Sequence, residues 1–217
     1  MGDGMVKVAV FISGSGSTLK NIIDHIADET LHAKIKCVVC SRRDAKGIQF
    51  AEEASIPVVV VPRKEYPTTE DFSAVVTQSI EPFSPELIVF GGFLSLYLFA
   101  PKYHGRIINI HPALLPCFGG KGMYGDRVHE AVLRAGCKVT GCTVHFVDEQ
   151  YDHGPIIAQR AIAVLEGDTV DTLGERVRAA ERELYPEVIN WFADSRVVLG
   201  PDGRVRVAGR GLLGEMQ

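Results

Sequence analysis

Apolar runs alternate along this chain with segments of helical periodicity. Leu19, Ile22 and Ile26 recur at the spacing of one helix face directly after the first run. Strands buried on both faces are predicted at residues 6–12, 35–40, 57–61, 87–90 and 106–110. This alternation is typical of an α/β fold, so we expect a Rossmann-like, open, twisted and mostly parallel sheet with helices on both faces.

The second half of the chain predicts an antiparallel edge to this sheet. Residues 138–147 alternate in a strand-like way, and residues 155–165 predict a partner strand antiparallel to them. Near the end of the chain, Gly200-Pro201-Asp202-Gly203 lies between two short apolar runs and predicts a hairpin over about 196–208. We expect residues 1–217 to form a single domain.

Polar residues mark the expected helix starts. Asp44 is expected to cap a short helix, and Thr68 or Thr69 to cap the next. A long amphipathic helix is predicted after Thr169, with Pro186 expected to bend it.

Composition and charge narrow the classes of function. The 217 residues are 46% hydrophobic and 23% charged, with a net charge of -4. No basic run exceeds Arg42-Arg43, which argues against nucleic-acid binding. No apolar stretch reaches the roughly 18 residues of a membrane helix, and residues 1–6 do not resemble a signal peptide. We therefore expect a cytoplasmic protein that acts on small molecules and binds no membrane.

The five cysteines predict neither a disulfide framework nor a metal site. Cys37 and Cys40 match a C-x-x-C pair, but they fall in a predicted strand, where positions three apart point to opposite faces. We expect them to be buried thiols, and we expect no bound metal.

A glycine-rich loop joins the first strand to the first helix. Residues 14–18 read G-S-G-S-T, and the N–H groups of a helix start favour an anion such as phosphate. The third glycine of a dinucleotide fingerprint would fall at Leu19, which argues against NAD. A tight turn without a ligand is the alternative.

Polar side chains of three other segments are candidates for chemistry. Asn109 and His111 share one side of a strand that Pro112 ends, and a ligand crevice borders such strand ends. Asp152 precedes a Gly-Pro pair that can hold its carboxylate inward. Glu181 falls in the apolar stripe of the last helix and needs a partner, either Arg178 or Arg182, or a ligand.

Several motifs, in this order, closely resemble the folate-dependent formyltransferases. They are I-S-G-S-G-S-T-L at 12–19, G-G-F-L at 91–94, N-I-H-P-A-L-L-P at 109–116, T-G-C-T-V-H-F-V at 140–147 and D-H-G-P at 152–155. The resemblance covers about residues 6–192. Members that formylate methionyl-tRNA or hydrolyse formyltetrahydrofolate carry a further domain that 217 residues do not accommodate, so the resemblance favours the short members, which formylate glycinamide ribonucleotide in purine biosynthesis.

The resemblance implies a role for particular residues. The catalytic positions match Asn109, His111 and Asp152. The loop for the substrate phosphate matches Gly16, Ser17 and Thr18, and the contact to the ribonucleotide matches Glu181. The segments that hold the pteridine match Leu94, Leu96 and Tyr97, together with the loop from Phe146 to Asp152.

The chain departs from the family pattern at a few of these positions. Thr18 stands where the family often has Asn, and Thr69 where many members have an Arg, for which Arg63 or Lys64 is a candidate replacement. Residues 119–127 are variable in the family, and there we expect a substrate role only for Met123 and Tyr124.

The implied reaction transfers the formyl group of 10-formyltetrahydrofolate, as co-substrate, to the amine of N1-(5-phospho-D-ribosyl)glycinamide. Asn109 would donate to the oxyanion, His111 would assist it or protonate the leaving nitrogen, and Asp152 would tune His111 and route a proton. A formyltetrahydrofolate hydrolase and a Rossmann-like nucleotide-binding module are the alternatives. The oligomeric state is expected to be monomer or homodimer.

Overall fold

Residues 4–209 are described by a computed structural model. Residues 1–3 and 210–217 lie outside this range. The prediction of a single domain over residues 1–217, and that of the N-terminal segment 1–6, therefore extend in part beyond the described residues.

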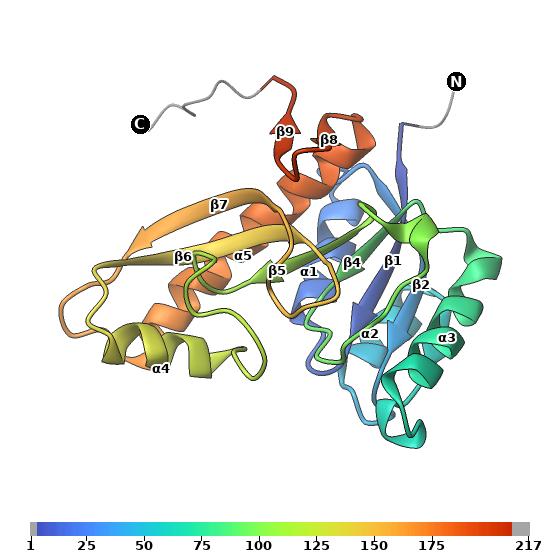
Figure 1. The fold of residues 1–217 in the computed structure, drawn as a ribbon, viewed down its shortest axis with the longest axis horizontal. Helices are drawn as coiled ribbons and strands as arrows, with labels where there is room; N and C mark the ends of the chain where they lie inside the picture. The colour runs from blue at the N-terminus through green and yellow to red at the C-terminus, as the bar shows by residue number, and fades with distance from the viewer. Residues whose placement is uncertain (1–3, 210–217) are drawn as a thin grey trace.

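A seven-stranded sheet forms the centre of the molecule (Figure 1). Its strand order is β3-β2-β1-β4-β5-β6-β7, parallel as far as β5 and antiparallel at the β5–β6 and β6–β7 pairs. The strands are β1 (Val6–Ile12), β2 (Ala33–Cys40), β3 (Val58–Val60), β4 (Leu87–Phe90), β5 (Ile107–His111), β6 (Val139–Phe146) and β7 (Ile156–Ala163). The predicted mostly parallel sheet with an antiparallel edge is confirmed.

Helices cover both faces of the sheet, as the buried strand runs predicted. The helices are α1 (Ser17–Ala27), α2 (Gly47–Glu53), α3 (Thr69–Ile80), α4 (Asp126–Arg134) and α5 (Val170–Ala193), with short 3-10 turns at Arg63–Glu65, Glu81–Phe83 and Pro101–Tyr103. Alternate β1 side chains divide between two cores, because Val10 packs with α1 and α5 and Phe11 packs with α3. Cys37 and Cys40 divide in the same way, so the prediction of two buried thiols on opposite faces is confirmed.

Two helix caps were predicted, and one of them is wrong. Thr68 caps α3 by accepting the Asp71 N–H at 3.0 Å. Asp44 caps nothing, because its carboxylate is bound by Arg42 and α2 begins only at Gly47. Pro186 lies inside the continuous helix α5.

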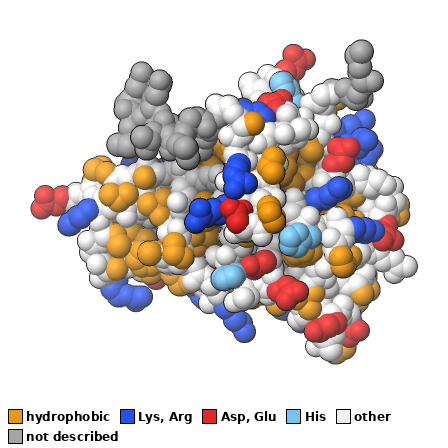
Figure 2. Space-filling model, turned by 45° about the horizontal axis from the view of Figure 1, so that its top comes forward, with side chains coloured by type: hydrophobic (Ala, Val, Ile, Leu, Met, Phe, Trp, Pro, Cys, Tyr) orange, Lys and Arg blue, Asp and Glu red, His pale blue; other side chains and the backbone are white. Residues whose placement is uncertain are grey.

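The antiparallel end of the sheet carries several exposed apolar side chains. β7 is the edge strand there, and Figure 2 shows hydrophobic side chains gathered at this end of the molecule. The exposed apolar residues of this region include Val139, Ile156 and Leu165. The predicted hairpin is present as β8 (Val197–Leu199) and β9 (Val205–Val207). Within residues 4–209, no helix has the length and apolarity needed to cross a membrane.

Candidate active site

A cavity of about 620 Å³ opens where β1, β4 and β5 end. The walls of the cavity come from the loops that follow β1 and β4 and from the last residues of β5. These are residues 14–18 after β1, residues 91–94 after β4, and residues 109–112 at the end of β5. Asp152 and Glu181 also line the cavity. The expected convergence of polar groups at the carboxyl edge of the sheet is therefore present.

Asp152 lies at the centre of the polar groups in this cavity. Its Oδ2 accepts the Gly120 N–H at 2.9 Å and lies 3.5 Å from Nδ1 of His111. Its Oδ1 accepts an Asn109 Nδ2–H at 3.4 Å and lies 3.7 Å from Nε2 of His145. The carboxylate thus touches groups from two strands and from the loop before α4.

Close backbone packing holds the loop of Asp152 against the sheet. Asp152 itself has a positive φ of 55°. A Cβ added to Gly154 would lie 1.9 Å from the Phe146 carbonyl oxygen, a separation that no side chain tolerates. Glycine at this position therefore lets the loop return directly onto β6, which places the carboxylate inward.

Burial and the neighbouring groups set the charges in the cluster. Burial by itself raises the pKa of Asp152, but polar neighbours that include His111 and the Gly120 N–H hold that pKa below its ordinary value. Burial lowers the pKa of His111, and the nearby Asp152 carboxylate offsets only part of this effect. Near neutral pH the cluster therefore holds an ionised carboxylate beside a mostly neutral imidazole.

His145 belongs to the same polar cluster, although the sequence predictions did not single it out. It lies directly opposite Asn109 in the β5–β6 pair and is fully buried against Asn109 and Asp152. Its alternation with Thr143 along residues 138–147 was visible in the sequence. The register that sets it against Asn109 is a pairing between strands, which a single sequence does not specify.

The N-terminus of α1 forms one end of the cavity. Gly16, Ser17 and Thr18 line it, and among residues 4–209 no side chain caps this helix and no acidic residue occupies its first turn. Unpaired N–H groups and the helix dipole at such an end favour an anion. Gly16 has a φ of 74°, and its added Cβ would lie 2.3 Å from the Gly47 Cα, so this glycine is required by the packing of α2 as well.

Glu181 faces the cavity from α5. Arg178 and Arg182 both bind Glu175, at 3.3 and 2.9 Å, and neither forms a hydrogen bond with Glu181. Burial raises the pKa of Glu181 to about 7, and the two arginines oppose this rise. A partly buried carboxyl group without a hydrogen-bond partner among the described residues thus faces the open space.

A family model described as formyl transferase matches residues 6–189, which are most of the chain. The chain belongs to the formyl transferase family.

Relatives and solved structures agree with this assignment. The chain is 40% identical over 187 residues to phosphoribosylglycinamide formyltransferase of Bacillus subtilis, covering 85% of this chain and 93% of that protein. It is 43% identical over 202 residues to the trifunctional purine biosynthetic protein adenosine-3 of Gallus gallus, where the match spans 92% of this chain and only 20% of that protein. The crystal structure of glycinamide ribonucleotide transformylase 1 from Symbiobacterium toebii superimposes with a TM-score of 0.85 at 36% identity, covering 94% of this chain and 95% of that one.

This formyl transferase chain has a second, narrower cavity of about 50 Å³ beside the first. Leu96 and Tyr97 line it together with Asn109 and Asp152. Tyr97 is buried, and its hydroxyl lies 2.7 Å from Thr77 Oγ1, so most of its side chain belongs to the core.

Leu94 and Phe146, which are also predicted to contact the pteridine of the formyl donor, lie in different surroundings. Leu94 is 47% exposed and lines the larger cavity. Phe146 lines neither cavity, because its ring packs against Phe192 in the core. A side-chain contact from Phe146 to a ligand in these cavities therefore does not fit the structure, although its neighbours Val147 and Asp148 do line the narrower one.

Arg63, one of the two candidate replacements for the family arginine, is bound to neighbouring residues of the chain. Arg63 donates to the Tyr66 carbonyl at 2.8 Å and to Thr69 Oγ1 at 3.2 Å, and it stacks on Phe72. Of the two candidates, Arg63 is thus engaged in internal contacts, and the charge of Lys64 contributes to lowering the pKa of the Asp44 carboxyl group.

The variable stretch before α4 closes the outer side of the large cavity. Met123 and Tyr124, for which a substrate role is predicted, line this cavity, and Arg127 stacks on the Tyr124 ring at 4.9 Å. His129, which the sequence predictions missed, also lines the cavity and is nearly fully buried. Within the described part of the chain, no cluster of three His, Cys, Asp or Glu side chains is arranged to hold a metal.

Proposed function

We propose that this chain transfers the formyl group of 10-formyltetrahydrofolate to the amine of N1-(5-phospho-D-ribosyl)glycinamide, a step of de novo purine biosynthesis. The observation that carries the proposal is the cluster of buried His111 with the partly buried Asn109 and Asp152, at a cavity that also holds an uncapped helix start. Two relatives that match over most of their own length are named phosphoribosylglycinamide formyltransferase, and these names support the choice of substrates.

The two ends of the large cavity suit the two parts of the ribonucleotide. The N–H groups at Gly16, Ser17 and Thr18 would bind the phosphate, since they carry the positive end of the α1 dipole. Glu181 would orient the amine or the ribose, because its carboxylate lacks a protein hydrogen bond. The pteridine of the donor would enter the narrower cavity, beside Leu96 and Tyr97 and next to Leu94.

The cluster would then stabilise each stage of the transfer. The amine attacks the formyl carbon, and the carbonyl oxygen becomes an oxyanion that Asn109 stabilises by donating an N–H. The new C–N bond leaves one proton too many on the amine, and the ionised Asp152 accepts it through water. His111, mostly neutral before the reaction, takes up this same proton from Asp152 and passes it to the leaving nitrogen N10 as the old C–N bond breaks, so that Asp152 returns to its ionised form.

The proposal includes the setting of the reaction. The chain would act in the cytoplasm, on small molecules rather than nucleic acid or membranes, as a single domain that is monomeric or homodimeric. The formyl donor would be a co-substrate, and no step would require a metal.

A formyl-transfer assay with the purified chain tests the proposal. We expect formylated ribonucleotide to form only when both substrates are present. Release of formate from the donor without any amine would favour the hydrolase alternative. Thermal stabilisation by NADPH and not by glycinamide ribonucleotide would favour the nucleotide-binding module. Absence of transfer under all conditions would refute the proposal.

A further inference from the structure

Asn109 is useful to the proposed reaction in only one of the two orientations of its carboxamide. The N–H end stabilises a developing oxyanion, whereas the carbonyl end repels it. The two orientations have nearly the same shape, so packing does not choose between them. The hydrogen-bond partners of Asn109 must therefore make the choice.

Those partners are His145 and Asp152. Nδ2 of Asn109 lies 3.2 Å from Nε2 of His145 and 3.4 Å from Oδ1 of Asp152. An ionised carboxylate only accepts hydrogen bonds, so Asp152 favours the N–H end at this place. The effect of His145 depends on which of its ring nitrogens carries hydrogen.

The backbone decides this tautomer. Nδ1 of His145 lies 2.8 Å from the carbonyl oxygen of Phe146, and a carbonyl oxygen only accepts. Nδ1 therefore carries the hydrogen and donates it, which leaves a lone pair on Nε2 in the neutral ring. His145 is only 1% exposed, so water offers no competing partner. The lone pair then accepts one N–H of Asn109.

We infer that His145 is a positioning residue that fixes the carboxamide of Asn109. Because Nε2 of His145 holds one amide hydrogen, the other is left toward Asp152. That second contact, at 3.4 Å, is longer than the usual N–H···O distance of about 2.9–3.0 Å, so it is readily exchanged for a substrate oxygen. The direct pairing of the two residues across β5 and β6 holds this arrangement in place. The inference rests on the proposed function of the site.

Two substitutions at this position separate positioning from packing. His145→Gln puts an amide oxygen near the place of Nε2 and keeps an acceptor for Asn109. Asn at position 145 is shorter, so its N–H donates to the Phe146 carbonyl as Nδ1 did, but no acceptor reaches the place of Nε2 near Asn109. We expect His145→Asn to lower kcat up to about 100-fold, as misplaced catalytic groups do. The KM values of both substrates should stay near those of the parent, and His145→Gln should retain most of the parent kcat.

The pattern across the two variants decides the outcome. Equal loss of kcat in both variants, or no loss in either, would overturn the inference, as would a loss that appears in KM rather than kcat. Circular dichroism and thermal unfolding identify a variant that fails to fold. For that case, nitrogen-15 NMR of the parent imidazoles gives an independent measurement.

The NMR measurement needs no substrate. We expect the His145 ring to carry hydrogen on Nδ1 and not on Nε2, with its signals assigned by through-bond correlations in the parent chain itself. Any other protonation pattern would overturn the inference. A parent chain that shows this tautomer but transfers no formyl group would refute the proposed function instead, so the two failures are distinguishable.

Discussion

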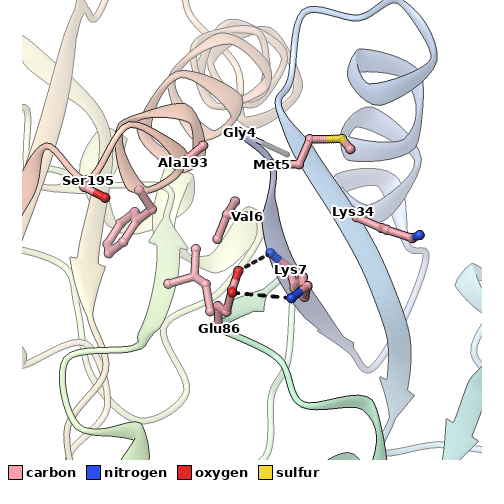
Figure 3. Close-up of a pocket in the computed structure, with 10 residues that line it drawn as sticks. Gly4, Met5, Val6, Lys7, Lys34, Glu86, Ala193 and Ser195 are labelled. Carbon is pink, nitrogen blue, oxygen red and sulfur yellow. Dashed lines mark hydrogen bonds and ion pairs between the residues drawn. The ribbon is translucent and has the colours of Figure 1, made fainter. Parts of the chain in front are cut away.

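Two cavities of similar volume lie at opposite ends of the same sheet. The cavity at the carboxyl ends of the strands measures about 620 Å³. The other, at the starts of β1, β2 and β4 and the end of α5, measures about 570 Å³ (Figure 3). By size alone, either is large enough for a small substrate.

The two cavities differ in the burial of their charged groups. At the amino end, Lys7 and Glu86 form an ion pair of 3.7 Å with side chains 52% and 50% exposed (Figure 3). Such a pair contributes at most about 1 kcal/mol. At the carboxyl end, the side chains of His111 and Asp152 are 4% and 10% exposed, so the charge of the Asp152 carboxylate acts strongly on the protonation of His111. Chemistry therefore distinguishes the two cavities where volume does not.

The strongest test of this contrast is Asp152→Asn. The amide still accepts the Gly120 N–H, but it neither takes up a proton near neutral pH nor favours a charged His111. We expect kcat to fall about 10²–10⁴-fold, the range typical of an acid–base group, while both substrates still bind. Single-turnover transfer and titration calorimetry measure the two effects.

The same variant makes a second, independent prediction. Because the Asp152 carboxylate raises the pKa of His111, its removal should lower that pKa further, which an NMR titration would detect. Transfer at the parent rate with normal binding would show that Asp152 is only a structural loop residue. The buried charge of Asp152 would then not distinguish the carboxyl-end cavity as the site of catalysis.

The sequence predicted this cluster because its members follow from local patterns. Asn109 and His111 alternate on one strand, and Asp152 precedes a Gly-Pro pair. His145 was missed because its partner is set by the register of two antiparallel strands. Asp44 was assigned to a helix cap, but the neighbouring Arg42 competes successfully for its carboxylate.

The second prediction concerns the phosphate end of the same cavity. Gly16→Ala puts a Cβ 2.3 Å from Gly47 at a positive φ, so we expect it to lower the free energy of unfolding by about 1–3 kcal/mol. Gly14→Ala is the matched control, since its Cβ meets nothing within 4 Å. Gly14→Ala should leave stability unchanged, because its methyl group has room. Because Gly14 lines the cavity beside the α1 start, the same methyl group should weaken ribonucleotide binding more than folate binding. Denaturant unfolding and calorimetry measure both, and equal loss of the two ligands in Gly14→Ala would contradict an anion site here.

The third prediction uses the raised pKa of Glu181. A carboxyl group with a pKa of about 7 in the folded protein and 4.5 in the unfolded chain binds more protons when folded, so its contribution to stability falls as pH rises from 4.5 to 7. Glu181→Gln removes this loss. The variant should therefore gain Tm relative to the parent across that window and keep a constant advantage above pH 7, while binding the ribonucleotide less tightly. A Tm difference that does not change with pH would rule out the raised pKa.

The smallest effect is expected from the matching substitution at the other cavity, Glu86→Gln. The amide oxygen still accepts the Lys7 N–H, and only an exposed ion pair is lost. We expect the free energy of unfolding to change by less than about 0.5 kcal/mol, because exposed pairs contribute little. Since no group of this cavity touches the proposed reactants, kcat and both KM values should equal those of the parent, measured in the same transfer assay beside Glu181→Gln. A loss of turnover in Glu86→Gln comparable to that of Asp152→Asn would mean that the amino end of the sheet takes part in the reaction, and the contrast between the two cavities would be wrong.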